Sequence, residues 1–436
     1  MTADKKTRPS VLGSLILDAA YLTAGVPVLA AGLLRGRLGR VWDHLRRRAF
    51  DAVPERPTGR PALWLHGVSV GEVLSARRLL EKIVEDFPAW DIVVSSSTRL
   101  GHEAARRDFA KHTVISFPLD LGFLVRRALR RLRPDVVVIV EHDLWPNFLR
   151  STIARGLPVV VVNARLSRRS LRGYRRLSRL YRWPPRELAA ICVQDDASAR
   201  SFQELGFSPE KIHVTGNLKF DNPPPPAAEG FRRQLGFDDG DWVLVAGSTH
   251  EGEEEAVLDT FGRIRRSDSR AFLILVPRRI ERTSEVAELV RSRGLSLGLW
   301  SEGPRRGPDV LLVDTVGELP RICAVGDVVF VGGSLVPVGG HNVIEPAALG
   351  RPVLVGPHYH NARSVVETFL ERDALVVVQD AGHLARAVAE LKEDPEAARQ
   401  LGERAAKTVE ENVGGVEKTL SVLRGFLEGT SPRNPL

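Results

Sequence analysis

A carboxylate follows a glycine turn in the stretch LWLHGVSVGEVLSA, residues 63–76. The first residues are apolar enough for a buried strand, and Gly71 and Glu72 stand where that strand would turn into a helix. Taken alone, a carboxylate in that place is a favourable acid in the first turn of a helix. The residues of this stretch by themselves do not assign it a chemical role.

Two glycine-rich turns have the composition of an anion site. Residues 247–249 (GST) precede an acidic helical segment, and residues 332–334 (GGS) follow a strand-like run. Such turns can present backbone N–H groups and the positive end of a helix dipole to a phosphate. Each turn taken alone is also compatible with a plain loop or a helix cap. The basic residues Lys219, Arg278 and Arg279 strengthen the phosphate interpretation.

A third candidate is the run HNVIEP, residues 341–346. Glu345 enters a helix behind a glycine-rich loop, where a carboxylate can accept hydrogen bonds from ribose hydroxyls. The alternative is a helix start that is capped by Asn342. The residues favour neither interpretation over the other.

The elements that must carry these turns are short apolar runs separated by amphipathic segments. Amphipathic helices are expected at residues 72–86 and 121–133. A polyproline segment, residues 221–226 (DNPPPP), is a stiff spacer and separates two series of strands. Alternation of buried strands with helices predicts parallel sheets with helical crossovers, a doubly wound α/β fold. The expected strands are residues 61–68, 91–98, 135–141, 158–164 and 189–195, then 242–248, 271–277, 310–315, 327–333 and 351–357.

The chain therefore predicts two similar α/β domains in tandem. The expected division is residues 1–48 as an N-terminal membrane anchor with a basic flank, residues 49–222 as the first domain and residues 223–436 as the second. In open α/β sheets, ligands bind beyond the carboxyl ends of the strands. Two such domains facing one another form a cleft that is lined by loops from both. The GT-B glycosyltransferases have this architecture, as do other two-domain enzymes.

The charge balance favours an anionic partner. The 436 residues include 62 Lys and Arg against 54 Asp and Glu, for a formal net charge of +8 and a pI near 9.8. This balance suits nucleic acid, acidic lipid or a phosphorylated substrate without choosing among them. Aromatic residues make up only 6%, and the interleaved aromatic and basic motif of an RNA-binding module does not occur. Cys192 and Cys323 lie far apart in apolar runs, which indicates a reducing setting and neither a disulfide framework nor a thiolate metal site.

The N-terminus contains an apolar run of membrane-spanning length, residues 11–34, interrupted by Asp18 and Pro27. An arginine-rich amphipathic stretch follows it, whereas a cleaved signal peptide has a small-residue cleavage site and a polar mature start. We interpret the run as an uncleaved membrane anchor. The heavier positive charge lies on the domain side, which predicts a cytoplasmic body beside an anionic membrane surface. The alternative is a helical hairpin buried against the first domain.

Seven motifs, in chain order, resemble the 3-deoxy-D-manno-octulosonic acid (Kdo) transferases of lipid A biosynthesis. They span nearly the whole chain and are HGVSVGE, EHDLWPN, NARLSRRSLRGY, TGNLKFD, GSTHEGEE, DTVGELP and FVGGSLVPVGGHNVIEPAALGRPVLVGPHYHN. The resemblance implies a GT-B fold of two Rossmann-like domains, CMP-Kdo as donor and the tetraacyl disaccharide 1,4'-bisphosphate precursor of lipid A as acceptor. It also implies a reaction without a metal or cofactor, at the cytoplasmic face of the bacterial inner membrane, and no nucleic-acid partner.

The same resemblance implies roles for individual residues. Glu72 matches the proposed catalytic base, which removes the proton of an acceptor hydroxyl as that hydroxyl attacks the anomeric carbon of Kdo and CMP departs. Opposite anomeric configurations of donor and product imply a single inverting displacement. The implied donor-side residues are Lys219, Arg278, Gly332, Gly333, Ser334, Asn342 and Glu345. The residues implied for the acceptor or the Kdo side are Ser69, Gly71, Glu141, Arg165, Ser167 and Arg168.

Three positions in two motifs depart from the family pattern. Residues 277–282 read PRRIER where many relatives have PRHPER, so a role for that histidine has no counterpart at Arg279. Gly67 stands where alanine is expected, which is a small change. Two other functions remain as alternatives. One is another GT-B nucleotide-sugar enzyme, such as a UDP-sugar transferase or a 2-epimerase, and the other is a membrane-tethered nucleic-acid-binding protein that only the high pI suggests.

Overall fold

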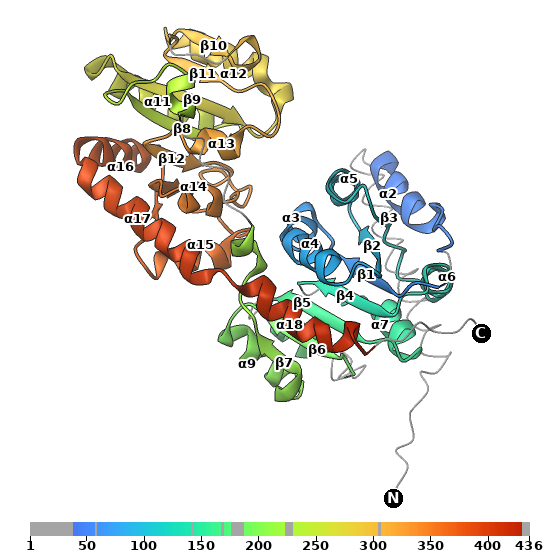
Figure 1. The fold of residues 1–436 in the computed structure, drawn as a ribbon. Helices are drawn as coiled ribbons and strands as arrows, with labels where there is room; N and C mark the ends of the chain where they lie inside the picture. The colour runs from blue at the N-terminus through green and yellow to red at the C-terminus, as the bar shows by residue number, and fades with distance from the viewer. Residues whose placement is uncertain are drawn as a thin grey trace, which may run out of the picture. The chain divides into compact units, whose positions relative to one another are not determined.

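Two compact units make up the protein, and each is described by itself. The computed structural model describes residues 38–56, 59–141, 144–166, 170–175, 187–222, 230–303 and 307–429. The first unit comprises Met1–Asn222 and Val413–Leu436, and the second comprises Pro223–Asn412. Each unit contains a sheet of seven parallel strands with helices packed on it (Figure 1).

The sheet of the first unit contains all five strands expected there. Its strands are β1 (Ala62–His66), β2 (Asp91–Ser96), β3 (Thr113–Ser116), β4 (Val136–Val140), β5 (Val159–Ala164), β6 (Ala190–Val193) and β7 (Ile212–Val214). Their order is β3-β2-β1-β4-β5-β6-β7, and every neighbouring pair is parallel. β3 and β7 are not expected from the sequence. They are short, partly exposed edge strands, so they lack the apolar run of a strand that is buried on both faces.

Helices cover both faces of this sheet. The described helices are α2 (Leu38–Phe50), α3 (Val70–Ser75), α4 (Arg77–Asp86), α5 (Arg99–Asp108), α6 (Gly122–Leu132), α7 (Pro146–Ile153), α9 (Asp196–Glu204) and α18 (Gly415–Leu427), with 3-10 turns η1 (Pro209–Lys211) and η2 (Leu218–Asp221). Side chains alternate between the faces along each strand. One face, around Trp64, packs against α6, α7 and α9, and the other, around Leu65, packs against α3, α4, α5 and α18. The expected helix at residues 72–86 is two helices that meet at Ala76.

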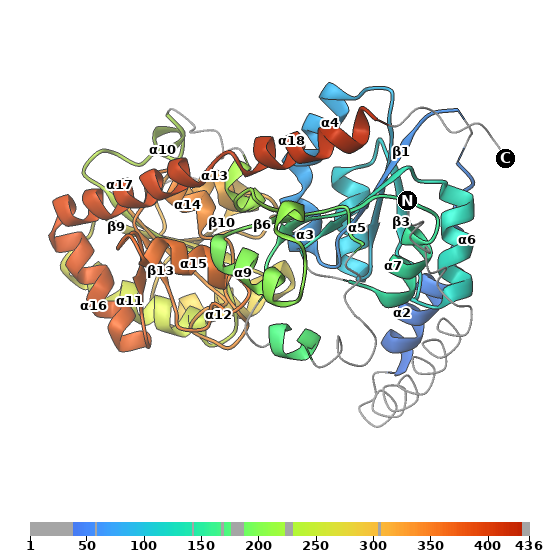
Figure 2. The same ribbon diagram turned by 90° about the horizontal axis from the view of Figure 1, so that it is seen from below.

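The last helix returns to the first unit. Asp221 accepts hydrogen bonds from the backbone N–H groups of Gly414 (2.7 Å) and Val416 (3.1 Å). From there α18 lies along α4 (Figures 1 and 2), and its apolar face is buried in the core of the first unit. The expectation that the second domain extends to residue 436 is therefore wrong. The apolar stripe of α18 is buried against the first sheet, and the second unit ends at Asn412.

The second unit repeats the same plan, and it also contains the five strands expected there. Its strands are β8 (Trp242–Thr249), β9 (Ala271–Pro277), β10 (Leu297–Leu299), β11 (Val310–Leu312), β12 (Val328–Val331), β13 (Val353–Val355) and β14 (Val376–Val377). Their order is β10-β11-β9-β8-β12-β13-β14. The described helices are α10 (Phe231–Gln234), α11 (Glu253–Ser267), α12 (Thr283–Ser292), α13 (Leu319–Cys323), α14 (Ile344–Ala348), α15 (Arg363–Leu370), α16 (Ala381–Glu393) and α17 (Pro395–Asn412), with 3-10 turns η3 (Ile280–Arg282) and η4 (Trp300–Glu302).

Each sheet has one point where the order of its strands reverses. In the first unit the chain builds outward from β1 through β2 to β3, and then restarts at β4 on the other side of β1. In the second unit the same change of direction separates β8 from β12. Loops diverge at the carboxyl ends of the strands at such a point, which is where open α/β sheets bind ligands. The two strand pairs β1/β4 and β8/β12 therefore mark the places to examine for a site.

The N-terminal helix α2 is joined to the first unit by Arg48, a residue that the sequence assigns to the anchor segment. Its Nε donates to the carbonyl of Phe117 (3.0 Å) and its Nη2 to that of Pro118 (3.1 Å). The same guanidinium lies 5.0 Å from the ring centroid of Trp145. None of the helices among the described residues has the length and apolar character to cross a bilayer. The anchor expected at residues 11–34 lies outside the described residues.

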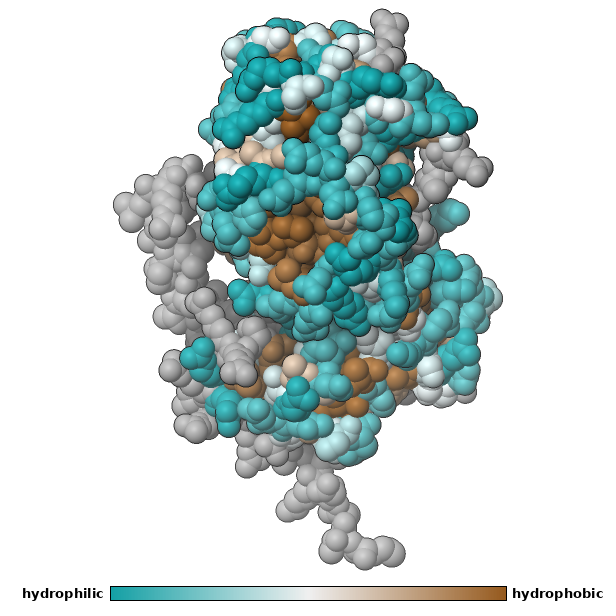
Figure 3. Space-filling model, turned by 90° about the vertical axis from the view of Figure 1, so that its left-hand side faces the viewer, coloured by the Kyte–Doolittle hydropathy of each residue, from teal (hydrophilic) through white to brown (hydrophobic). Residues whose placement is uncertain are grey.

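The surface is mostly hydrophilic. Hydrophilic side chains cover most of the face in Figure 3, with an apolar area in its middle. Among the described residues, large apolar side chains that are more than half exposed include Trp42 and Phe50 on α2 and Phe123 on α6. Scattered apolar residues are ordinary on a protein surface. The exposure of these three residues is therefore informative only together with the residues beside them.

Removing apolar volume from α18 should destabilise the first unit. This helix follows the second unit in the chain, but it packs in the core of the first. Leu423 is fully buried, and Leu423→Ala is expected to lower the free energy of unfolding by about 2 to 5 kcal/mol. Leu100→Ala is the matched control, because Leu100 is 61% exposed, and it should change the value by less than about 0.5 kcal/mol. Hydrogen exchange of β1 and β4 measures the effect. Equal exchange in the two variants would contradict the assignment of α18.

Candidate functional site

Glu72 lies in the first turn of α3, directly after β1. Its Oε2 accepts a hydrogen bond from the backbone N–H of Val68 (2.8 Å), and its Oε1 accepts one from the hydroxyl of Ser69 (3.0 Å). Ser69 Oγ in turn accepts from the backbone N–H of Glu72 (3.3 Å) and caps the helix. This reciprocal arrangement resembles a capping box. The structure thus shows the helix-capping role of Glu72, and it places the half-buried carboxylate at the β1/β4 reversal.

The loop that carries Glu72 is held by the neighbouring strand. The carbonyl of Val68 accepts hydrogen bonds from Ser96 Oγ (2.7 Å), Thr98 Oγ1 (2.9 Å) and the backbone N–H of Thr98 (3.2 Å). At Gly67, a Cβ would come within 3.1 Å of the backbone nitrogen of Val73. The tight packing at Gly67 and the three bonds to one carbonyl leave the loop little freedom, so the position of the Glu72 carboxylate is set by the fold.

A buried histidine lies beneath this loop. His66 ends β1, stacks on Phe117 with ring centroids 3.7 Å apart, and places Nδ1 3.0 Å from Ser95 Oγ. Burial, with a smaller effect of the Arg48 charge, lowers the pKa of His66 to about 3. The imidazole is therefore neutral at physiological pH, and it serves as a packing group below the site.

A second pair of predicted site residues meets at the next strand ends. Glu141 follows β4 with φ 64°, a left-handed conformation that is uncommon for a residue other than glycine. Its Oε1 lies 3.3 Å from Nζ of Lys219, which belongs to η2. Lys219 thus belongs to the first unit with Glu141. The other residues predicted for the donor side belong to the second unit.

The Lys219 turn is positioned by a residue that was not selected from the sequence. Asn163, at the end of β5, is fully buried with φ 54°, and its Oδ1 accepts from the backbone N–H of Leu218 (3.1 Å). Its carbonyl accepts from Gln194 Nε2 (3.0 Å) at the end of β6. Asn163 is the first residue of the NARLSRRS motif, so the motif marks its position in the sequence. An asparagine at the end of an apolar run does not by itself predict a left-handed backbone conformation.

The remaining residues predicted for the first unit are partly informative. Ser69 is the α3 cap described above. At Gly71, a Cβ would meet only Ser69 Oγ, at 3.9 Å, so no packing within the protein requires glycine there. Arg165 follows β5 and is half-buried. Ser167 and Arg168 lie outside the described residues.

The glycine-rich loop after β12 is bound from within by a buried carboxylate. Glu253, at the start of α11, is fully buried. Its Oε2 accepts from the N–H groups of Gly333 (2.7 Å) and His250 (3.0 Å), and its Oε1 accepts from those of Ser334 (2.9 Å) and Leu335 (2.8 Å). These four donors form the kind of concavity that elsewhere holds a phosphate. Here the anion is a side chain of the protein.

The prediction that Gly332, Gly333 and Ser334 bind the donor phosphate stays a prediction, and the structure shows the present partners of these residues. The N–H of Gly332 donates to the carbonyl of Gly247 (2.8 Å), and those of Gly333 and Ser334 donate to Glu253. The Ser334 hydroxyl donates to the carbonyl of Val331 (2.6 Å) and accepts from the N–H of Gly356 (2.7 Å). These three backbone N–H groups are therefore engaged within the protein. The sequence could not reveal this, because the partner carboxylate lies 80 residues upstream.

Two histidines and an arginine gather beside this loop. His250 follows β8, His341 opens the HNVIEP run, and their Nε2 atoms lie 2.9 Å apart with the rings nearly parallel. Arg278 follows β9, is exposed, and lowers the pKa of both histidines by its charge, although burial has the larger effect on each. A permanent cation thus accompanies neutral imidazoles at the carboxyl edge of the second sheet.

Asn342 does not cap α14, whose N-cap is Val343, and the assignment of Glu345 to the ribose stays a prediction. The side chain of Asn342 is exposed, and its Oδ1 accepts from the backbone N–H of Ile344 (3.0 Å), which is a turn stabilised by the side chain. Burial raises the pKa of the Glu345 carboxyl, opposed by a hydrogen bond with Asn342. The two side chains lie together at the start of the short helix α14, in the loop that His341 opens.

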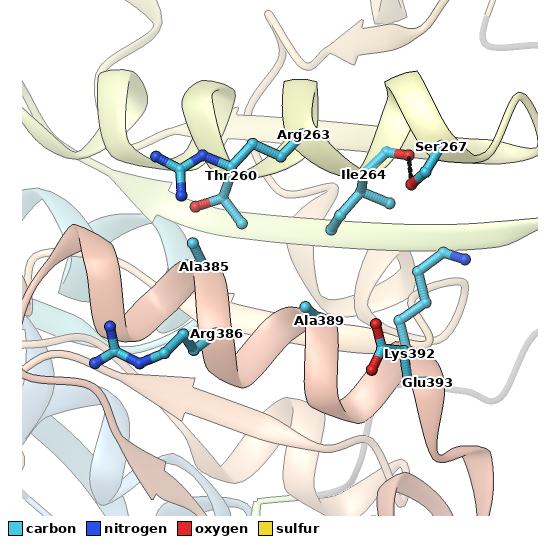
Figure 4. Close-up of a pocket in the computed structure, with 9 residues that line it drawn as sticks. All are labelled: Thr260, Arg263, Ile264, Ser267, Ala385, Arg386, Ala389, Lys392 and Glu393. Carbon is cyan, nitrogen blue, oxygen red and sulfur yellow. Dashed lines mark hydrogen bonds between the residues drawn. The ribbon is translucent and has the colours of Figure 1, made fainter.

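The described residues contain no group of three or more His, Cys, Asp and Glu side chains arranged to hold a metal ion. A shallow pocket lies elsewhere, between α11 and α16 (Figure 4). Arg263 and Arg386 lie at one end of it, and Ser267 and Lys392 at the other. Thr260, the lining residue nearest to Glu253 on α11, is seven residues after it, which corresponds to about 10 Å along the helix. Glu253 itself does not line the pocket.

The comparisons with known proteins agree with this geometry. A family model described as 3-deoxy-D-manno-octulosonic-acid transferase (kdotransferase) matches residues 37–222. A 3-deoxy-D-manno-octulosonic acid transferase of Haemophilus influenzae is 32% identical over 373 residues, which are 84% of this chain and 87% of the relative. The chain belongs to the Kdo transferase family. This Kdo transferase is accordingly a glycosyltransferase, as its sequence motifs imply.

Solved structures support the fold of the Kdo transferase. It is similar to a putative UDP-N-acetylglucosamine 2-epimerase from Listeria monocytogenes (14% identity, TM-score 0.57, 87% of this chain and 100% of that one). It is also similar to a glycosyltransferase from Rickettsia africae (13% identity, TM-score 0.54, 85% and 100%). At these identities the likeness concerns the fold alone. Two parallel-sheet α/β units with such neighbours agree with the expected GT-B class.

The buried carboxylate of Glu253 should be essential to the stability of the second unit. Glu253→Ala removes the acceptor for four N–H groups in a buried place, and we expect a loss of unfolding free energy on the order of 3 kcal/mol or more. Glu251→Ala is the matched control, because that side chain is exposed two residues away. Denaturant unfolding with hydrogen exchange of β8 and β12 measures both. A Glu253→Ala protein as stable as the control would contradict the role of this carboxylate.

Proposed function

We propose that this Kdo transferase transfers Kdo from CMP-Kdo to the tetraacyl disaccharide 1,4'-bisphosphate precursor of lipid A, with Glu72 as the base. The observation that carries the proposal is the position of the Glu72 carboxylate. It is held at the β1/β4 reversal of a chain that belongs to the Kdo transferase family. That is where a doubly wound sheet binds its ligand.

The proposed step is a single displacement with inversion. The oxygen of an acceptor hydroxyl forms a bond to the anomeric carbon of Kdo, while the bond from that carbon to the phosphate oxygen of CMP breaks. The hydroxyl proton passes to the Glu72 carboxylate, and CMP leaves with the electron pair of the broken bond. A hydroxyl is a weak nucleophile, so a positioned base contributes typically about 10² to 10⁴ in rate.

The capping bonds of Glu72 are compatible with this role. Val68 N–H and Ser69 Oγ each occupy one lone pair of the carboxylate, one on each oxygen. The bonds hold the carboxylate in one orientation, which is what a base needs if the acceptor hydroxyl is to meet it within hydrogen-bond distance.

Cations on both units suit a donor that carries a phosphate and a carboxylate. In the second unit, Arg278 has an exposed guanidinium at the carboxyl edge, and we assign it to the CMP phosphate. In the first unit, Lys219 is about a quarter exposed and paired with Glu141. We assign Lys219 to the negative charge of the donor, with Glu141 holding the ammonium in place. Asn342 and Glu345 remain assigned to the nucleotide.

Glu72→Gln separates the two roles of the residue. Glutamine keeps a side-chain oxygen for the capping bond but cannot take a proton, so kcat should fall by about 10² to 10⁴ with a small change in KM. Glu103→Gln, on the exposed part of α5, is the matched control and should transfer normally. The measurement is transfer of radiolabelled Kdo from CMP-Kdo, generated in situ, to the acceptor in detergent. Near-normal transfer by a folded Glu72→Gln protein would overturn the base assignment.

The same assay separates the alternatives for the donor. A UDP-sugar transferase or a 2-epimerase would use a UDP-sugar and leave CMP-Kdo unchanged, although its fold would be the same. A folded protein that transfers nothing from CMP-Kdo would therefore remove the proposed donor. Steeply salt-dependent binding of oligonucleotides would instead favour the nucleic-acid alternative.

We also propose that the protein acts at the cytoplasmic face of the bacterial inner membrane, anchored by residues 11–34. Exposed aromatic side chains with arginines beside them support this location. Trp42 and Phe50 are 60% and 73% exposed on α2, next to Arg46, and Phe123 is 58% exposed on α6, next to Arg127. Aromatic rings suit the membrane interface, and each arginine near an anionic surface contributes about 1 kcal/mol. Such a surface would meet an acceptor that is itself an anionic lipid.

Loss of the aromatic side chains of α2 should weaken membrane binding. In a chain that lacks residues 11–34, so that the proposed anchor does not dominate binding, Trp42→Ser with Phe50→Ser is expected to lower the affinity for vesicles containing anionic lipid by about tenfold. Val316→Ser with Val413→Ser, at two other exposed apolar positions, is the matched control. Flotation with vesicles at low and high salt measures the binding. Equal flotation of the two double variants would contradict a membrane contact through α2.

A further inference from the structure

The pair His250 and His341 joins two loops of the second unit through one hydrogen bond. The Nε2 atoms lie 2.9 Å apart, the ring centroids are 5.2 Å apart, and the ring planes are inclined by only 5°. His250 follows β8, and His341 lies 91 residues later in the loop that precedes α14. At 2.9 Å one ring must donate N–H and the other must accept it. The pair therefore requires two rings that are not both protonated.

Glycine at position 333 makes room for the pair. Gly333 has φ 68°, and a Cβ there would lie 2.8 Å from Cδ2 and Nε2 of His341 and 3.4 Å from Cδ2 of His250. The rings therefore pack directly against the backbone of the loop after β12. The same loop is bound by Glu253, which also accepts the backbone N–H of His250. Two segments that are far apart in sequence, the end of β8 and the loop between β12 and α14, thus meet at the two imidazoles.

The loop that His341 opens carries residues assigned above to the nucleotide. Asn342 and Glu345 follow His341 by one and four positions. Asn342 is held by its own short turn, and α14 spans only five residues, so local structure gives the loop limited support. The bond from His341 to His250 is one link between this loop and the end of β8, beside the bond from Gly332 N–H to the carbonyl of Gly247 and the bonds to the Glu253 carboxylate. It is the link next to Asn342 in the chain, so we expect the position of Asn342 towards a ligand to depend on it.

We propose that His250 and His341 are a positioning pair for the donor nucleotide, joined by a single shared hydrogen bond. This inference rests on the proposed function, because it concerns the same donor site. Neither histidine needs to touch the reacting atoms. The pair sets the place of the loop that carries Asn342 and Glu345, so its loss affects binding of the donor more than the chemical step.

Burial and the surrounding charges preserve the hydrogen bond between the two rings at neutral pH. Burial, then Arg278 and His250, lower the pKa of His341 to about 4. Burial also lowers the pKa of His250, and the charged groups acting on it are Glu253, which raises it, and Arg279, Arg278 and Arg282, which lower it. An ordinary histidine titrates near 6.5. Because both values lie lower in the folded protein, the bond is complete at pH 7 and is lost only as the pH falls through the lowered values.

The first test measures the hydrogen bond itself in the intact chain, without an activity assay. Long-range ¹H–¹⁵N NMR of protein labelled at histidine reports the protonated nitrogen of each ring. At pH 7.5 we expect two neutral rings of opposite tautomer, one carrying its proton on Nε2 and the other on Nδ1, and we expect both rings to titrate below the range of an ordinary histidine. His250→Gln and His341→Gln assign the signals. Two rings of the same tautomer, or ordinary titration near pH 6.5, would overturn the proposal.

The second test uses donor KM and separates the bond from the ring. Phenylalanine keeps a flat ring but removes the hydrogen bond, so His250→Phe and His341→Phe should each raise KM for CMP-Kdo about five- to tenfold, with kcat changed less than twofold. Glutamine can still donate and accept, so the Gln variants should stay within about threefold of wild type. His213→Phe on β7, in the first unit, is the matched control.

The double variant decides whether the two residues act together. If one bond is responsible, His250→Phe with His341→Phe should raise KM no more than either single change, because the second substitution has nothing left to remove. Independent, multiplying effects would overturn the pair. Failure of the proposed function is distinguishable: a wild type that transfers no Kdo while showing the opposite tautomers removes the donor assignment and leaves the bond. Normal transfer with an unchanged KM in the Phe variants removes the positioning role alone.

Discussion

Within each sheet, all strands are parallel to one another, and the rest of each unit depends on that constraint. Parallel strands bring all their carboxyl ends to one edge, so the polar loops that follow them meet there even when the chain between them is long. The residues selected from the sequence follow β1, β4, β5 and β7 in the first unit and β9 and β12 in the second, while residues 247–249 are the last residues of β8. Buried strands need helices on both faces, and the crossover helices supply that cover. The site and the core are thus consequences of one arrangement.

In two of these loops, a carboxylate side chain of the protein accepts the hydrogen bonds of the loop. Glu72 accepts a backbone N–H and a hydroxyl at the start of α3, and Glu253 accepts four backbone N–H groups at the loop after β12. A buried N–H without a partner is costly, and an anionic acceptor strengthens each bond. The difference lies in exposure. Glu253 is fully enclosed and can serve only the fold, whereas Glu72 is half-buried at the strand reversal and can also meet a substrate.

Tertiary contacts reassign pieces of chain that sequence order places elsewhere. The C-terminal helix α18 completes one layer of the first unit, and its entry is held by two hydrogen bonds to Asp221. Arg48 ties α2 to the loop after β3 in the same way. In both cases a charged side chain satisfies backbone groups at the point where a segment arrives, and an apolar or aromatic surface completes the contact. The boundary of a unit is therefore set by what a segment buries.

The sequence by itself determined the fold class, the ten central strands and the family. Long apolar runs identify strands buried on both faces, and motifs that combine glycine with charged residues mark their ends. The sequence also placed Glu72, Glu141 and Arg278 at strand ends, because those residues lie beside such runs, whereas Lys219 was selected through its charge and the family resemblance.

Only the tertiary structure decided which backbone groups remain available and which residues are partners. It showed that Glu253 occupies the amides of the loop after β12, that His250 meets His341, and that α18 belongs to the first sheet. The physical reason is that a hydrogen bond depends on distances of about 3 Å between atoms. Chain segments separated by 80 residues or more acquire such distances only when the sheet is formed. The periodicity of apolar residues shows which face of a helix or strand is apolar. It does not show which segment of the chain will pack on that face.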